Sequence, residues 1–182
     1  LYLAVQFKEL GVPLILALNM VDVAESRGIK VDHRELSIQF GVPVVPMVAR
    51  SGKGITDLLD KVVEEAVKNP EWVNAPMSYG IDIDSGLARI ASIIEKSPIF
   101  DQKYPARWRA LKCLEGDRQI TGLLERDPEA GQSIKAICDA IFKHTMDTLE
   151  EEPEAIIADH RYGYIAGITK KVVKRRIELR LN

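Results

Sequence analysis

Two polar residues close an apolar run near the start of the chain. The segment from Leu14 to Asp22 reads LILALNMVD, so Asn19 and Asp22 follow five apolar residues and stand three positions apart. A carboxylate can accept two parallel, charge-assisted hydrogen bonds from the N1–H and the exocyclic amino group of guanine. Adenine presents a lone pair at its N1, so the same carboxylate would lose a partner there. We therefore predict that Asp22 reads the Watson–Crick edge of guanine.

The amide of Asn19 offers both a hydrogen-bond donor and an acceptor. It suits either the Hoogsteen edge of the base or a tie between neighbouring loops, with Met20 and Val21 as apolar walls of the pocket. Asn and Asp after a strand more commonly cap a helix or shape a turn. The N-x-x-D spacing therefore needs support from the rest of the chain.

A second loop of this kind follows the next apolar run. Residues 42–48 read VPVVPMV and lead into Ala49, Arg50 and the small-residue stretch 51–54. A backbone amide near Ala49 could donate to the guanine O6, and the stem of Arg50 could lie over the base plane. A plain strand-to-helix turn is the alternative. The GKG of this stretch is not a phosphate loop, because no serine or threonine follows its lysine and the earlier glycine is missing.

These loops require a parallel sheet flanked by helices. Apolar runs at 13–18 and 42–48 predict strands, and amphipathic segments at 32–40 and 55–67 predict helices. In open α/β sheets ligands gather beyond the carboxyl ends of the strands, which is where both loops lie. Two parallel strands do not form a stable sheet alone, so we expect the other strands to precede the first residue.

The second half of the chain follows a different pattern. Residues 71–80, rich in proline, glycine and asparagine, are predicted to link residues 1–70 to a helical bundle at 81–182. No strand is expected there, and Asp84 is a predicted helix N-cap. Expected helices span 85–95, 105–115, 118–125, 129–149 and 153–181.

Composition favours a globular chain with real cores, since 46% of the 182 residues are hydrophobic. The net charge of −2 gives no overall attraction to nucleic acid or an anionic membrane. No window approaches 18 uninterrupted apolar residues, so no membrane span is expected within the chain. Cys113 and Cys138 have no CxxC or His partner at ligand spacing, which favours reduced, packed thiols.

Other polar groups have weaker claims to a site. The acidic turn near His144 could attract a divalent metal ion, but a solvated turn explains it better, and no metal site is predicted. The motif Asp159–Tyr162 either holds the two halves together through an Asp or Arg pair or forms a helix-surface ion network. The basic end of the last expected helix fits a helix C-terminus or a segment beside a membrane.

NMVD after an apolar strand, with an Ala-Arg loop about 28 residues later, resembles the base-specificity motifs of translation-factor-like and Ras-like GTPases. Met20 replaces the usual lysine and Val48 the common serine. The resemblance implies an α/β fold with the last two strands of a P-loop GTPase-like parallel sheet, followed by an all-α bundle. The implied guanine-binding residues are Asn19, Met20, Asp22, Val48, Ala49 and Arg50.

Longer stretches resemble one family within that group, ferrous iron transport protein B (FeoB). They are LALNMVDVAESRGIKVDHRELSIQFGVPVVPMVARSGKGI in the first half, with RWRALKCLEGD and IADHRYGYIAGI in the second. This implies a GTP- or GDP-binding unit that regulates ferrous iron uptake through its own membrane permease. It also implies a helical domain that inhibits nucleotide dissociation, Mg²⁺ in the intact protein, a possible homo-oligomer, and a place at the cytoplasmic face of the bacterial inner membrane.

The sequence contains no GxxxxGK[ST], so we expect this chain alone not to hydrolyse GTP, although the intact protein would. Two alternatives remain. A ribosome- or RNA-associated GTPase should carry a basic accessory domain, and residues 80–160 are neither basic nor aromatic enough for one. A non-catalytic interaction module would use the nucleotide fold only as support.

Overall fold

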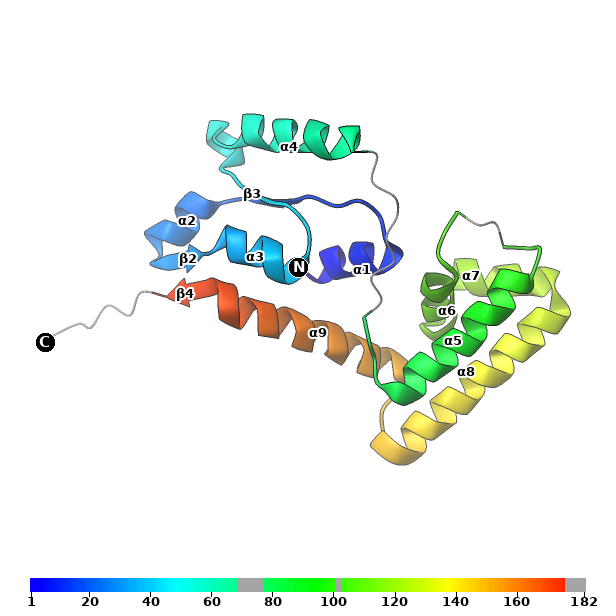
Figure 1. The fold of residues 1–182 in the computed structure, drawn as a ribbon. Helices are drawn as coiled ribbons and strands as arrows, with labels where there is room; N and C mark the ends of the chain where they lie inside the picture. The colour runs from blue at the N-terminus through cyan, green and yellow to red at the C-terminus, as the bar shows by residue number, and fades with distance from the viewer. Residues whose placement is uncertain (69–76, 101–102, 176–182) are drawn as a thin grey trace, which may run out of the picture. The chain divides into compact units, whose positions relative to one another are not determined.

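The computed structural model describes residues 1–68, 77–100 and 103–175 (Figure 1). Contacts divide the chain into two compact units, of which one comprises residues 1–7, 12–73 and 163–182 and the other residues 8–11 and 74–162. The predicted linker at 71–80 lies mostly outside the described residues. Helices α1 (Tyr2–Leu10) and α9 (Pro153–Val172) each contribute to both units.

The first unit alternates short strands with helices, as the sequence predicts. Two stretches of the predicted strands form a parallel pair, with Leu16 opposite Val44 and Leu18 opposite Pro46. The elements that follow α1 along the chain are β1 (Leu16–Leu18), α2 (Val21–Ser26), β2 (Ile29–Val31), α3 (His33–Phe40), β3 (Val44–Pro46), the 3₁₀ turn η1 (Ala49–Ser51) and α4 (Ile55–Val67).

The parallel strands are shorter than predicted. Each has three residues, and the pairing continues one step further where the Met47 amide donates to the Leu18 carbonyl at 2.9 Å. The apolar run into Asn19 suggested burial on both faces, yet Ala17 is exposed and its neighbours are half-buried. Within the described residues β1 pairs only with β3, so a single neighbour covers it.

A second, antiparallel pair contradicts the prediction that no strand follows residue 80. Strand β4 (Val173–Arg175) pairs with β2, with Val31 opposite Val173 and Lys30 opposite Lys174. The helix predicted to run from 153 to 181 therefore ends at Val172. The chain leaves the helix there because the Val172 carbonyl accepts from the Asp32 amide at 2.8 Å, which starts the ladder.

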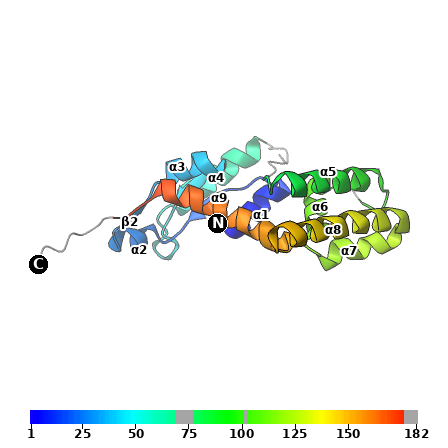
Figure 2. The same cartoon turned by 90° about the horizontal axis from the view of Figure 1, so that it is seen from below.

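The second unit is helical, as predicted. Its elements are α5 (Ile81–Lys96), α6 (Ala106–Leu114), α7 (Arg118–Leu123), the 3₁₀ turn η2 (Leu124–Arg126), α8 (Pro128–Leu149) and the first part of α9. Leu87, Ile90, Ile134 and Ile157 are at most 1% exposed and anchor the core. Helices α5 and α8 lie side by side (Figures 1 and 2) and contact closely at Gly86, where a Cβ would meet the Ile141 Cδ1 at 2.2 Å.

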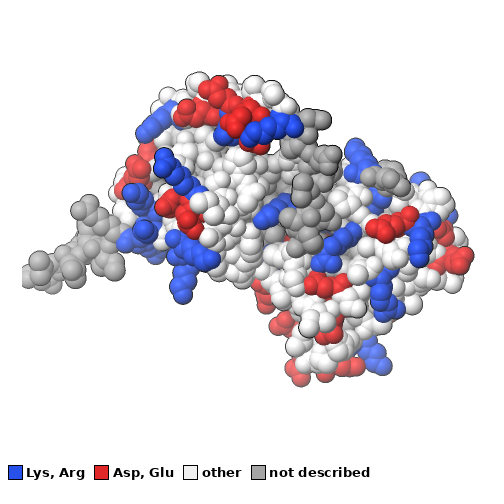
Figure 3. Space-filling view, viewed as in Figure 1, with Lys and Arg blue, Asp and Glu red and all other residues white. Residues whose placement is uncertain are grey.

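Figure 3 shows Lys and Arg interspersed with Asp and Glu over the face in view. Across the described ranges, no helix combines the length and the apolar character that crossing a membrane requires.

Candidate functional site

Asn19 joins the two predicted loops. It follows β1 directly, and its side-chain Oδ1 accepts from the backbone amides of Met20 at 2.8 Å and Ala49 at 3.0 Å. Ala49 begins η1, just past the carboxyl end of β3. Of the two uses predicted for Asn19, the structure therefore has the tie between neighbouring loops.

Met20 holds the first loop in an unusual backbone conformation. Its φ of 63° and ψ of 33° lie in the left-handed region, which few non-glycine residues adopt. The bond from its amide to Asn19 supports this conformation, and its carbonyl accepts from the Ala24 amide at 3.1 Å at the start of α2. Its side chain is 57% exposed, so the methionine lies at the surface beside the loop.

Asp22 and Arg50 face each other across the two loops. The Arg50 Nη2 lies 3.2 Å from the Asp22 Oδ2, and the side chains of Arg50 and Asp22 are 82% and 35% exposed respectively. Asp22 stands in the first turn of α2, where the helix dipole favours a negative charge. Because water reaches the ion pair, either member can exchange its partner at small cost.

The second loop is held by backbone geometry. The Val48 amide donates to the Lys53 carbonyl at 2.9 Å, and the Val48 carbonyl accepts from the Ser51 hydroxyl at 3.2 Å. Gly54 has a φ of +82°, and a Cβ there would lie 2.5 Å from the Pro46 carbonyl oxygen. Only glycine fits this turn, which explains part of the small-residue stretch that the sequence shows.

The structure thus brings five of the six predicted site residues into direct contact. Asn19, Met20 and Ala49 share hydrogen bonds, and Asp22 and Arg50 share an ion pair. The sixth, Val48, is only 6% exposed and contributes its backbone. Sequence reasoning did not foresee the ion pair or the steric requirement at Gly54, although an acid after one strand and a base after the next could have suggested the pair.

The hydrogen-bonding groups at these loops are of the types that guanine recognition requires. Asp22 is an acceptor whose ion-pair partner, Arg50, is largely exposed, and Arg50 provides a long apolar stem with a planar head. The Ala49 amide, expected to lie near the base O6, donates to Asn19 in this structure. The base contacts of all six residues stay predictions.

A second polar cluster lies inside the helical unit. Arg161 is 2% exposed and pairs through Nη2 with the Glu9 Oε2 at 2.8 Å and through Nη1 with the Glu115 Oε1 at 2.6 Å. Tyr79 donates its hydroxyl to Glu9. Burial, together with Glu9, raises the pKa of Tyr79, so it keeps its proton. Arg161 therefore belongs to a buried ion cluster within the helical unit and not to a helix-surface network, while Asp159, His160 and Tyr162 are exposed.

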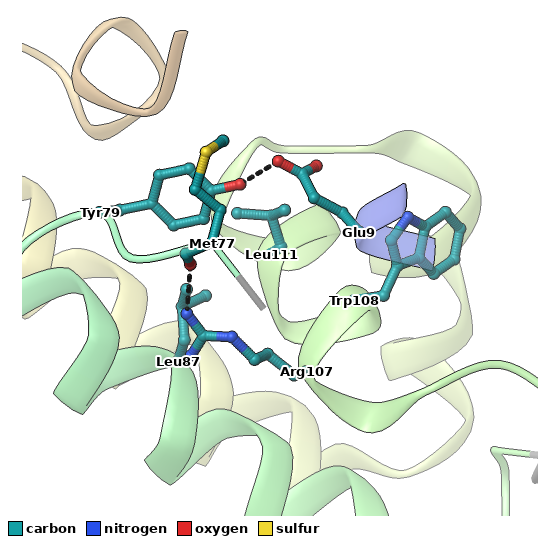
Figure 4. A pocket seen from close by; sticks show the side chains of 7 residues that line it. All are labelled: Glu9, Met77, Tyr79, Leu87, Arg107, Trp108 and Leu111. Atoms are coloured by element: carbon teal, nitrogen blue, oxygen red, sulfur yellow. Dashed lines mark hydrogen bonds between the residues drawn. The ribbon is translucent and has the colours of Figure 1, made fainter. Parts of the chain in front are cut away.

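A small cavity of about 10 Å³ adjoins this cluster (Figure 4), near the size needed for a single water molecule. Arg107 closes one side, donating to the Met77 carbonyl at 3.0 Å and to the Asp84 Oδ1 at 2.7 Å. The residues that line this cavity are Glu9, Met77, Tyr79, Leu87, Arg107, Trp108 and Leu111.

Asp84 corrects one prediction about the helix start. Helix α5 begins at Ile81, so Asp84 lies inside the first turn and is not the N-cap. Its carboxylate instead accepts from the Ser78 hydroxyl at 2.6 Å, the Tyr79 amide at 3.2 Å and Arg107. Partial burial works to raise the pKa of Asp84, but the bonds from Ser78 and Arg107 outweigh it and hold the pKa below its usual value.

In the described part of the chain, no group of three or more His, Cys, Asp or Glu side chains could hold a metal ion. His144 lies 3.3 Å from Asp82. Both cysteines are free, as predicted, and burial raises the pKa of Cys113 to about 12 and that of Cys138 to about 11.

Comparison with known proteins follows the same division of the chain. The family model described as "Ferrous iron transport protein B" matches residues 1–62, and the one described as "FeoB cytosolic helical domain" matches residues 79–174. A Porphyromonas gingivalis Fe(2+) transport protein A/Fe(2+) transporter FeoB fusion protein is 33% identical over 177 residues, which cover 96% of this chain and 21% of that protein.

The Fe(2+) transporter FeoB of Escherichia coli K12 is 36% identical over 174 residues, 92% of this chain and 20% of the relative. The chain spans about a fifth of the length of these curated relatives. Among solved structures, a GDP-bound mutant of S. thermophilus NFeoB aligns with a TM-score of 0.76, 27% identity and coverage of 95% of this chain and 63% of that one. The T. maritima FeoB cytosolic domain in a GDP form aligns with a TM-score of 0.71 and 26% identity. This alignment covers 95% of this chain and 62% of that one.

Proposed function

Because this chain belongs to the ferrous iron transport protein B family, we propose that it carries the guanine-reading loops of a G domain. The single observation that carries the proposal is the Asn19 amide, whose Oδ1 binds Met20 and Ala49 and so holds both loops together. The GDP-bound state of the similar S. thermophilus protein supports a guanine nucleotide as the ligand.

In this proposal Asp22 is the residue that selects the base. Its carboxylate accepts from the N1–H and the 2-amino group of guanine, which engages both oxygens. Arg50 then releases the Asp22 Oδ2, and its stem covers the base plane. Asn19 keeps the loops joined, while Met20, Val48 and Ala49 form the rim and backbone of the base pocket.

The rest of the assignment follows the family. We assign residues 1–70 to the C-terminal portion of the G domain, 71–80 to a linker and 81–182 to a helical domain that slows nucleotide dissociation. The intact protein is proposed to bind and hydrolyse GTP with Mg²⁺ and to regulate ferrous iron passage through its permease at the cytoplasmic face of the inner membrane. Phosphate chemistry requires a phosphate loop, which this sequence does not contain.

Competition between nucleotides tests the proposal in the longer parent chain. Inosine diphosphate lacks the 2-amino group, so it should displace fluorescent GDP about 10–100-fold less well than GDP, since one of two bonds to Asp22 is lost. Adenosine diphosphate should be weaker still. An Arg126→Ala variant, changed at an exposed position in η2, should keep the same order. Equal affinities for guanosine and inosine diphosphates would remove Asp22 from the base pocket.

A further inference from the structure

The β2–β4 pair places two lysines directly opposite each other. Lys30 is the middle residue of β2 and Lys174 the middle residue of β4, and the register of the ladder pairs them (Figure 1). Both side chains are exposed, whereas Val31 and Val173 are half-buried on the other face of the ladder. Like charges directly opposite each other destabilise an antiparallel pair. Neither lysine forms an ion pair with a described residue, so the outer face of this ladder carries an unrelieved repulsion.

The two lysines lie within a wider positive region of the first unit. Segments 25–35 and 170–175, which contain both strands and the ends of the neighbouring helices, hold seven Lys or Arg residues against three Asp or Glu. The whole chain has a net charge of −2, so positive charge is concentrated in these segments. Lys and Arg predominate where the first unit carries β2 and β4 (Figure 3).

Two of the three acids in this region already have hydrogen-bond partners. The Asp32 side chain accepts from the Glu35 amide at 3.0 Å, which caps α3. The Glu35 side chain accepts from the Gln39 side chain at 2.7 Å. These bonds tie both acids to α3, and the ammonium groups of Lys30 and Lys174 stay available to an external anion.

Phosphate groups held in a plane are the partners that this surface fits. A lysine binds phosphate as a point charge, with little demand on geometry. Single-stranded nucleic acid would also require aromatic side chains on which its bases stack, and segments 25–35 and 170–175 contain none. A bilayer with anionic lipids presents many phosphates in one plane, which suits cations on the outer face of a ladder.

We propose that Lys30 and Lys174 bind the anionic phospholipid headgroups of a bilayer, so that the outer face of the β2–β4 pair lies on the membrane surface. The headgroup phosphates neutralise the two opposed ammonium groups and remove the repulsion across the ladder. This inference rests on the proposed place of the protein at the cytoplasmic face of the inner membrane. It does not depend on guanine recognition by Asp22.

Co-sedimentation with vesicles tests the contact. At about 0.1 M salt, this chain should bind extruded phosphatidylcholine vesicles that contain about one third phosphatidylglycerol, and it should not bind vesicles of phosphatidylcholine alone. Each lysine near an anionic surface contributes about fivefold in affinity, so Lys30→Glu combined with Lys174→Glu should weaken binding at least about 25-fold.

The control variant carries the same change in net charge at another place. Lys135→Glu combined with Lys143→Glu alters two exposed lysines of α8 and should change the affinity for the vesicles less than about threefold. Inorganic phosphate at the same ionic strength as the salt it replaces should not displace the chain from the vesicles. Competition by free phosphate beyond the effect of ionic strength would assign the site to a soluble anion and overturn the proposal.

Urea unfolding without lipid separates lipid binding from a structural role of the lysines. Lys174→Gln removes the repulsion, so it should leave the unfolding midpoint unchanged or raised while it weakens vesicle binding about fivefold. A lowered midpoint would contradict the repulsion on which the proposal is built.

Three results with the vesicles would overturn the proposal. They are no binding to the anionic vesicles, equal weakening by the Lys30–Lys174 variant and the α8 control, and tighter binding to a DNA duplex of about 20 base pairs than to the vesicles. The competition between guanosine and inosine diphosphates does not involve these lysines, so a failure here leaves the proposed base recognition standing.

Discussion

Two polar clusters join distant segments of this chain, and they differ in their access to water. The loop pair built on Asn19, Asp22 and Arg50 is exposed, with an Arg50 side chain that is 82% accessible. The cluster around Arg161 is closed, and this side chain is only 3% accessible. Exposed contacts can exchange partners for a ligand at small cost, whereas buried ones fix the fold. The exposed loop pair is thus suited to the proposed recognition of a ligand, and the buried cluster to holding the helices in place.

The buried cluster should produce the largest effect on stability. Arg161→Met leaves the buried Glu9 carboxylate without its guanidinium partner and removes one of the two cations that pair with Glu115, so it should cost about 3–5 kcal/mol of unfolding free energy. Urea denaturation followed by circular dichroism measures this loss. A cost below about 1 kcal/mol would mean that the cluster is effectively solvated.

Substitutions in the turn after β3 should have the next largest effect on stability. Gly52 and Gly54 both lie in this turn and allow a matched comparison. Gly52→Ala meets only the cost of a positive φ, about 1–2 kcal/mol, because nothing lies within 4 Å of a Cβ there. Gly54→Ala adds a Cβ that would lie 2.5 Å from the Pro46 carbonyl oxygen, and we expect about 3 kcal/mol in total. Equal costs in thermal or urea unfolding would show that the close approach is unimportant.

Acid should weaken the helical unit through Asp84. Its folded pKa is held below the usual value, so the stability it contributes is present above about pH 4 and is lost as the pH falls through the folded pKa. We expect Asp84→Asn to cost about 1–2 kcal/mol at about pH 6 and progressively less toward about pH 3. A difference between the two proteins that does not change with pH would contradict this role.

The exposed ion pair should matter least to stability. Arg50→Ala should change the unfolding free energy by less than about 1 kcal/mol, and added salt should reduce that change further. Paired with Arg161→Met under identical conditions, it measures the contrast between the two clusters. A loss as large as that of the buried arginine would remove the distinction.

Local patterns explain why the loop pair could be predicted. An apolar run followed by Asn19 and Asp22 is a local signal, and so is the run before Ala49 and Arg50. The short strands could not be foreseen in the same way. Strand β2 has only three residues, and Val173–Arg175 continues the pattern of α9, so its pairing depends on a partner more than 140 positions away.

The helical unit shows the same limit at the level of single side chains. The apolar spacing of α8 predicts its buried face, and its start at Asp127–Pro128 agrees with a predicted helix from 129 to 149. Burial of Arg161 depends on Glu9, which precedes it by 152 residues, and no local pattern reports such a distance. Asp84 was misassigned because the first turn of α5, Ile81–Asp84, resembles a capping segment.

Substitution of Asp22 tests most directly the proposal that its carboxylate reads the guanine base. In the longer parent chain, Asp22→Asn replaces an acceptor oxygen with a donor that suits the extra carbonyl of xanthine. Affinity for guanosine diphosphate should fall at least about tenfold and that for xanthosine diphosphate should rise by a similar factor, measured by competition against a fluorescent nucleotide. Unchanged affinity and selectivity would contradict base reading by Asp22.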